Sequence, residues 1–291
     1  MRHPGLKLRM AVVGSILAAF YLVVVAAAMV MYGTGIVPFA IAGSVLLVGV
    51  QYKIGKWAAL RSVGAEELSE SQHPEIHRVV EKHSDAMGID KPELKIARMG
   101  VPNAFAVGRK GAGIVVVSEE LIQLLDREEL EGVLAHELAH IANRDVITMQ
   151  LGQGIASIVG IAAQFAVLLT GDNDIADFFL AIVVGNVVQF IVMIFVLAIS
   201  RYREYVADAD AKRAIGGGDP LARALEKIQQ GNQRGAESSR TGRRGRGGRQ
   251  QDGGVDQQVS ALCISSPDSG FLQKIVSTHP PMEKRIERLR S

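Results

Sequence analysis

Four apolar blocks constrain the fold of this 291-residue chain more than any other feature. They cover residues 10–32, about 36–52, about 146–170 and about 175–199, and the first holds no charged residue over its 23 positions. A helix of that length rises about 1.5 Å per residue, so it can cross a hydrocarbon core of about 30 Å. We therefore expect a polytopic membrane protein with about four transmembrane helices.

The individual blocks leave alternatives open. The basic start of the chain and the alanines at 26–28 resemble a signal peptide. The first apolar run exceeds the usual ~7–15 residues of such a peptide, however, so we favour a retained anchor. The second block contains Pro38 and fits either a span or a partly interfacial helix; we adopt the span. Glutamine and asparagine residues inside the last two blocks usually pair between helices. Two alternatives stay open for these polar residues. They could line a water-filled path for the substrate, or the two blocks could lie partly outside lipid.

The basic residues of the short loops predict the orientation. Lysine and arginine precede the first block, follow the second and follow the fourth, whereas the turns at 33–35 and 171–177 contain neither. Because such residues are in excess in cytoplasmic loops, both termini and both polar segments are expected on the cytoplasmic side of the cell membrane. The expected segments are an N-terminal transmembrane hairpin at 1–52, a cytoplasmic segment at 53–145, a second hairpin at 146–199 and a cytoplasmic segment at 200–291.

Composition excludes several classes of partner and site. The net charge is only +2, so no overall field favours a polyanionic partner. Cys263 is the single cysteine, which rules out an intramolecular disulfide and a cysteine zinc cluster within one chain. Residues 231–258 almost lack apolar side chains and should be disordered. Six arginines lie between 234 and 249, but no aromatic residues alternate with them for base stacking, so we expect a solvated loop and no specific nucleic acid.

The polar segment at 53–145 is expected to form a compact α+β unit. Helical spacing of apolar residues ends at Gly88, and two strand patterns follow, the second a hairpin that turns at "GRKGAG". Asp126 and Glu129 then form a capping-box pattern before another helix. The fold class is therefore mainly α with a small α+β part.

That helix contains the sequence His136-Glu137-Leu138-Ala139-His140. Two histidines four residues apart project from one face of a helix and can bind one Zn²⁺ at about 2.0–2.1 Å. Glu137, between them, can act as general base toward the attacking water. The pattern predicts one catalytic zinc ion per chain and hydrolysis of peptide bonds.

A catalytic zinc ion needs a third protein ligand. Asn143 and Val146 occupy the positions where the metzincin motif has a glycine and a third histidine, so a carboxylate from a second helix is expected. Glu204 is the candidate, and Asp208, one turn later, can accept a hydrogen bond from a ligating histidine. Asp210 is the rival, and a surface ion pair with neighbouring arginines is the alternative for Glu204. We favour Glu204 because the second hairpin brings its two ends side by side.

Three further motifs accompany the zinc motif: "NAFAVG" at 103–108, "RYREYVAD" at 201–208 and "STHPP" at 277–281. Together these motifs resemble the HtpX membrane zinc metalloproteases, relatives of the type I CAAX prenyl endopeptidases. The similarity covers nearly the whole chain except 231–258. It implies a cytoplasmic gluzincin domain that acts in stress response and protein quality control, on misfolded or damaged membrane proteins.

The resemblance also implies roles for single residues. Zinc would be bound by the two histidines and Glu204, with Glu137 as base. The strand that begins with Asn103, Ala104, Phe105 and Ala106 would pair with extended substrate backbone. His279 either caps and packs the last helix or steadies the oxyanion of the reaction.

Two other functions stay open. The enzyme could process one defined substrate, such as a lipidated protein. Alternatively, the chain could be a non-catalytic membrane scaffold whose Arg/Gly loop binds RNA or lipid. An intact base beside two histidines, without a closed set of four ligands, argues against the scaffold. The expected partners are therefore protein and peptide substrates, membrane proteins among them, and the lipid bilayer.

Overall fold

The computed structural model is mainly helical with one small sheet, which confirms the expected mainly α class with a small α+β part. The residues fall into two compact units, which we call the sheet unit and the apolar unit. The structure describes residues 33–171, 174–243 and 279–291, and isolated positions between Leu8 and Val30. The sheet unit consists of Lys56–Ile147 and Arg201–Ser291 and the apolar unit of Arg2–Gly55 and Thr148–Ser200, as far as these are described.

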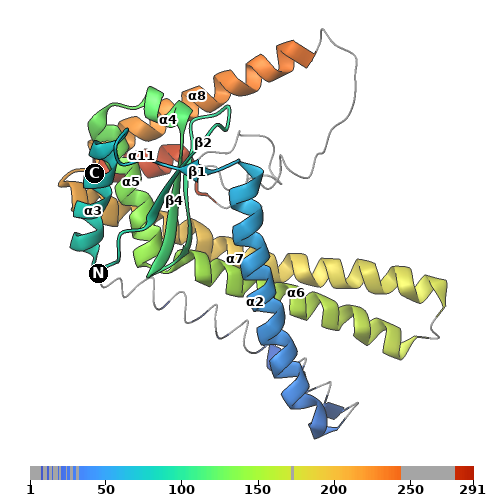
Figure 1. Cartoon of the computed structure of the whole chain (residues 1–291). Coiled ribbons are helices and arrows are strands. Elements are labelled where there is room, and N and C mark those ends of the chain that lie inside the picture. The colour runs from blue at the N-terminus through green and yellow to red at the C-terminus, as the bar shows by residue number, and fades with distance from the viewer. Residues whose placement is uncertain are drawn as a thin grey trace. The chain divides into compact units, whose positions relative to one another are not determined.

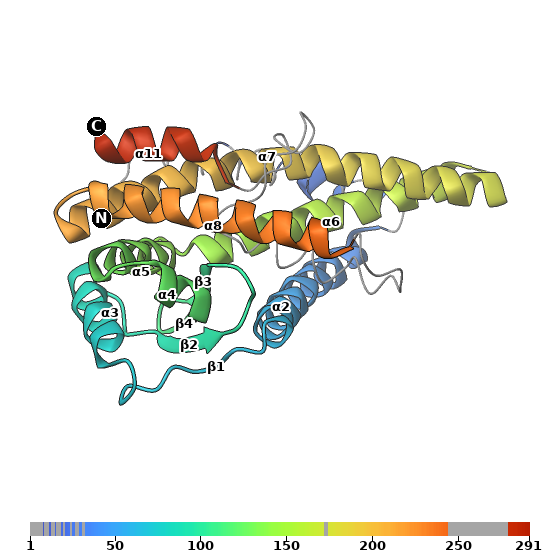
Figure 2. The same cartoon turned by 90° about the horizontal axis from the view of Figure 1, so that it is seen from above.

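Four strands form one sheet (Figure 1), and their order in it is β1-β2-β4-β3, with all four labelled in Figure 2. The strands are β1 (Glu66–Glu67), β2 (Glu93–Ala97), β3 (Ala104–Arg109) and β4 (Ala112–Ser118). β3 and β4 form the predicted hairpin, in which Arg109 pairs with Ala112. Gly108 and Gly111 have φ of 98° and 82°, values that favour glycine at this turn. β3 lies at one edge of the sheet.

Helices cover both faces of the sheet. Val115 and Val117 point into the main core, which α3, α5 and α8 complete. Ile114 and Val116 alternate with them and pack against Leu60 on the other face. The helices that lie wholly in the sheet unit are α3 (Pro74–Met87), α4 (Glu119–Leu124), α5 (Arg127–Ala142), α8 (Asp219–Arg243) and α11 (Met282–Arg290).

α5, which carries the two motif histidines, begins with the predicted capping box. The Glu129 backbone N–H donates to Asp126 Oδ1 at 3.0 Å, and the Asp126 N–H donates to Glu129 Oε2 at 3.0 Å. Lys227 of α8 also donates to Glu129, which ties α8 to the start of α5. A Cβ at Gly132 would lie 3.1 Å from the Leu221 backbone, so the close packing of these helices favours glycine. Figure 2 shows α8 alongside α5 and α11.

Two helices among the described residues are long and apolar enough to cross a membrane, α6 (Asp145–Thr170) and α7 (Ile175–Ile215). Their large apolar side chains, such as Phe178, are mostly exposed, which suits contact with lipid. Close backbone approach at Gly160 and Gly185 holds the two helices together. The third apolar block is therefore a helix of the expected length, and the fourth forms the first part of a longer helix.

The first two blocks are less fully described. The second lies in α2 (Val37–Ser62), a helix longer than the block itself. The first, at 10–32, lies largely outside the described residues, and the positions that are described there are helical.

The helix expected to start near residue 200 is instead the continuation of the fourth apolar block. α7 runs without a break from the block to Ile215, where Gly216 takes a φ of 79° and ends it. Glu204 and the apolar residues therefore belong to the same helix.

The disorder predicted for 231–258 is wrong for its first part, because α8 continues to Arg243. No proline follows Pro220 in this helix, and alanine, arginine, glutamate and glutamine are good helix formers. The remaining residues, 244–258, lie outside the described part of the chain.

Candidate metal centre

Two helices bring the three predicted ligands together. His136 and His140 lie one turn apart on α5, and their Nε2 atoms are 3.1 Å from each other. Glu204 approaches from α7, with Oε2 3.5 Å from His136 Nε2 and Oε1 3.4 Å from His140 Nε2. These three side chains form a group able to hold one metal ion.

The spacing of these atoms fits a tetrahedral zinc ion. Ligand bonds of about 2.0–2.1 Å at tetrahedral angles separate the ligand atoms by about 3.3 Å, close to all three observed separations. Two imidazole nitrogens and one carboxylate are also the ligand types that zinc accepts in catalytic sites. The two rings meet edge to face, and their Nε2 atoms lie 3.1 Å apart. If both nitrogens were unprotonated, their lone pairs would repel each other unless a proton or a cation lay between them. The residues present therefore fit the ion.

Each histidine is also held at its other ring nitrogen. His136 Nδ1 lies 3.0 Å from Asp208 Oδ1, and His140 Nδ1 lies 2.6 Å from Asp145 Oδ2. A carboxylate at Nδ1 keeps the ring proton there and leaves the Nε2 lone pair for a cation. The other oxygen of Asp145 lies 2.6 Å from Arg203 Nε. Both histidines are thus oriented by buried acidic groups.

A buried arginine balances these carboxylates. Arg285 on α11 donates from Nε and Nη2 to Asp208 at 2.9 and 2.7 Å, and its Nη1 lies 3.2 Å from Glu204 Oε2. Met282 and Leu289 are the other buried residues of this short helix. Arg285 lies on the apolar stripe of this amphipathic helix, and that position in the sequence indicates a buried cation.

Burial and charge shift the pKa values of the acidic groups in opposite directions. Burial raises the pKa of Glu137 and so makes it a better proton acceptor. Burial acts the same way on Asp208, but the Arg285 guanidinium outweighs it and lowers the pKa of that carboxyl. For Glu204, which lies beyond the apolar part of α7, burial is outweighed by the charges of His279 and Arg285, and the pKa falls well below its usual range. Glu204 and its neighbour Asp208 therefore stay ionised.

The remaining predicted site residues divide into two groups. His279 joins the cluster, with Nδ1 3.1 Å from Glu204 Oε2, and Glu137 is buried beside His136. Asn103 and Ala104–Ala106 lie on a different element, at the start of the edge strand β3, which contacts the histidine helix α5.

A histidine pair with an intervening glutamate, closed by a carboxylate from a second helix, is the arrangement of a metallopeptidase, a hydrolase of peptide bonds. Sequence comparison identifies the peptidase family to which the chain belongs. The chain belongs to peptidase family M48, whose family model matches residues 70–291.

Similar proteins point to the HtpX type within that family. A protease HtpX homolog of Halobacterium salinarum is 71% identical over 290 residues, which cover 97% of this chain and 100% of that protein. Another, from Pyrococcus abyssi, is 38% identical over 252 residues, 83% of this chain and 81% of its own length. The crystal structure of S. mikatae Ste24p matches 97% of this chain with a TM-score of 0.58 at 18% identity, and the chain spans 63% of that longer protein. This last similarity supports the fold.

Proposed function

We propose that the protein is a membrane-embedded zinc endopeptidase that hydrolyses peptide bonds of misfolded or damaged membrane proteins. The observation that carries this proposal is the meeting of His136, His140 and Glu204 around one point, with the buried Glu137 beside them. The proposed layout has four spans, and its basic flanks favour an active site on the cytoplasmic side. The exposed apolar surface of α6 and α7 supports contact with lipid.

In this proposal His136, His140 and Glu204 hold one zinc ion, while Asp208 and Asp145 fix the two rings. When bound, zinc supplies Lewis acidity that polarises the scissile carbonyl and makes a water molecule more acidic. Binding, orientation and proton transfer fall to the side chains.

Glu137 is the proposed proton carrier. It takes a proton from the attacking water and returns it to the leaving amine. The burial that raises its pKa suits a carboxylate that must hold a proton between these two steps. His279, about one-fifth exposed and 3.1 Å from Glu204, is the proposed donor to the oxyanion that forms on the substrate.

The substrate is proposed to bind as an extended strand beside β3. β3 pairs with β4 on one side only, and its outer edge has no strand neighbour within the described sheet. Its side chains Ala104, Phe105 and Val107 are buried, so backbone groups are the main feature that this edge offers. An added strand would be held through its backbone, which accommodates many sequences and suits a protease that acts on damaged proteins.

Glu137→Gln tests the chemistry. The variant, purified as the full chain in detergent, should keep about one zinc ion per chain. It should lose at least about 100-fold in cleavage rate, the lower end of what a general base contributes. Glu128→Gln, an exposed substitution of the same type on the same helix, should cleave normally. Cleavage by Glu137→Gln at the parental rate would refute the assigned base.

The substrate class needs a separate comparison. One membrane protein can be offered in its native form and in a form destabilised by a cavity-forming core substitution. The proposed role predicts faster cleavage of the destabilised form, because its strands and loops open more often. Equal cleavage of both forms at one defined site would instead indicate a processing protease.

A further inference from the structure

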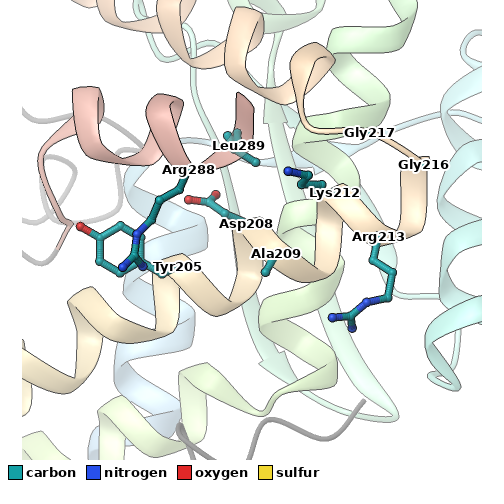
Figure 3. A pocket seen from close by; sticks show the side chains of 9 residues that line it. All are labelled: Tyr205, Asp208, Ala209, Lys212, Arg213, Gly216, Gly217, Arg288 and Leu289. Carbon is teal, nitrogen blue, oxygen red and sulfur yellow. The ribbon is translucent and has the colours of Figure 1, made fainter. Parts of the chain in front are cut away.

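A second concave site lies next to the metal centre, between α7 and α11. The pocket has a volume of about 560 Å³. Its walls come from the last turns of α7, the glycines that follow and the end of α11 (Figure 3). That volume lies in the range of about 300–1,000 Å³ typical of small-ligand sites.

The pocket is separate from the site of peptide hydrolysis. Asp208 lines it and contacts Nδ1 of His136, whereas Nε2 of the same ring faces the other metal ligands. The two nitrogens lie on different sides of the imidazole, so Asp208 is behind the ring as seen from the metal. A molecule in the pocket would therefore not occupy the position of the scissile peptide.

The walls of the pocket carry net positive charge. Lys212, Arg213 and Arg288 line it, and Asp208 is the only carboxylate among the lining residues that the structure describes. Both oxygens of Asp208 already accept hydrogen bonds from Arg285. Arg213 pairs within its own helix, but neither Lys212 nor Arg288 has an ion-pair partner in the part of the chain that the structure describes.

Arg288 is held in place without its charge being neutralised. Its guanidinium lies 4.1 Å from the centre of the Tyr205 ring, a cation–π contact that fixes the side chain. The contact occupies a face of the ring, so stacking of a nucleobase there is disfavoured. The planar fork of N–H donors is suited to the oxygens of a phosphate group, and the lysine ammonium adds a second positive charge.

We propose that this pocket binds a phosphate-bearing anion. The volume exceeds that of a lone phosphate ion, so a phosphate ester fits better. Its source is either a soluble ester or the headgroup of an anionic phospholipid, because both present the same chemistry to Lys212 and Arg288. The site is additional to the proposed protease function and does not depend on it.

Binding to the full chain in a neutral detergent tests the proposal, with glycerol 3-phosphate titrated by calorimetry. A second arm reconstitutes the protein in phosphatidylcholine bilayers that contain phosphatidylglycerol, and native mass spectrometry counts the phosphatidylglycerol molecules retained. Lys212→Gln and Arg288→Gln should each weaken binding at least fivefold, roughly the effect of losing one charged hydrogen bond at a partly exposed site. Lys284→Gln, an exposed cation on α11 outside the pocket, is the matched control.

Loss of binding in the two pocket variants, with the control unchanged, supports the proposal, and the arm in which it occurs identifies the source of the phosphate. Binding should also weaken as salt is added. The proposal is overturned if neither probe binds the parent protein. It is equally overturned if the pocket variants bind as tightly as the parent, or if Lys284→Gln loses as much affinity as they do. Unchanged melting temperatures establish that the variants are folded.

Discussion

Replacing Asp145 by asparagine tests how His140 is oriented toward the metal. The buried carboxylate lies 2.6 Å from His140 Nδ1 with one oxygen and 2.6 Å from Arg203 Nε with the other. An amide has one acceptor end and one donor end, so one neighbour must face an N–H group. If the donor faces His140, the ring proton moves to Nε2 and the lone pair for zinc is lost. If it faces Arg203, two donors oppose each other in a buried site.

Loss of such a partner typically costs 10- to 100-fold in metal affinity, or about 1.4–2.7 kcal/mol. We expect a loss of this size for Asp145→Asn, measured on the full chain in detergent by competition with a fluorescent zinc chelator. Asp210→Asn is the control, because Asp210 is also buried and bonds to Asn143 and Arg213 outside the ligand group. It should stay within about twofold of the parent. Parental affinity in Asp145→Asn, or an equal loss in the control, would refute the reasoning.

Three further substitutions test other parts of the account. Asp126→Ala removes the cap of α5 and should cost about 1 kcal/mol of stability in thermal unfolding. The Glu129 backbone N–H lowers the pKa of Asp126, so the loss of stability in the variant should be largest above about pH 4 and should shrink as the pH falls below it. A loss of stability that does not change with pH would contradict this. Gly185→Ala would press a methyl group against α6 and should lower the melting temperature. Gly43→Ala is the control, because a Cβ there would have no atom within 4 Å, and it should leave the melting temperature unchanged. Equal effects of the two substitutions would refute the close packing of α6 on α7. Arg285→Met leaves two buried carboxylates without their cation, so the metal-free protein should lose about 3–5 kcal/mol of its free energy of unfolding. Added zinc should then stabilise this variant more than it stabilises the parent. An unchanged melting temperature without metal would contradict this.

Features with local causes were predictable from the sequence. The capping box depends on Asp126 and Glu129, three residues apart, and the β-hairpin on glycines at its turn. The approach of Glu204 to the histidines was predictable for a different reason. Two long apolar helices joined by a short turn must run side by side, so the polar ends of the hairpin meet.

Other features depend on contacts that no local pattern specifies. Arg285 and Asp208 are 77 residues apart in sequence, and nothing in either segment alone indicates that they pair. The length of α8 was misjudged because two tendencies compete in its sequence. Low apolar content favours disorder, while alanine, arginine and glutamate favour helix, and packing of its first turns on α5 and α11 adds stability to the helix.

The most direct test of the central claim is to locate the metal itself, by anomalous diffraction at the zinc edge from crystals of the full chain. We predict a single peak per chain, within about 2.0–2.2 Å of His136 Nε2, His140 Nε2 and one oxygen of Glu204. A zinc peak bound by other residues, or one that leaves Glu204 outside the coordination sphere, would contradict the account.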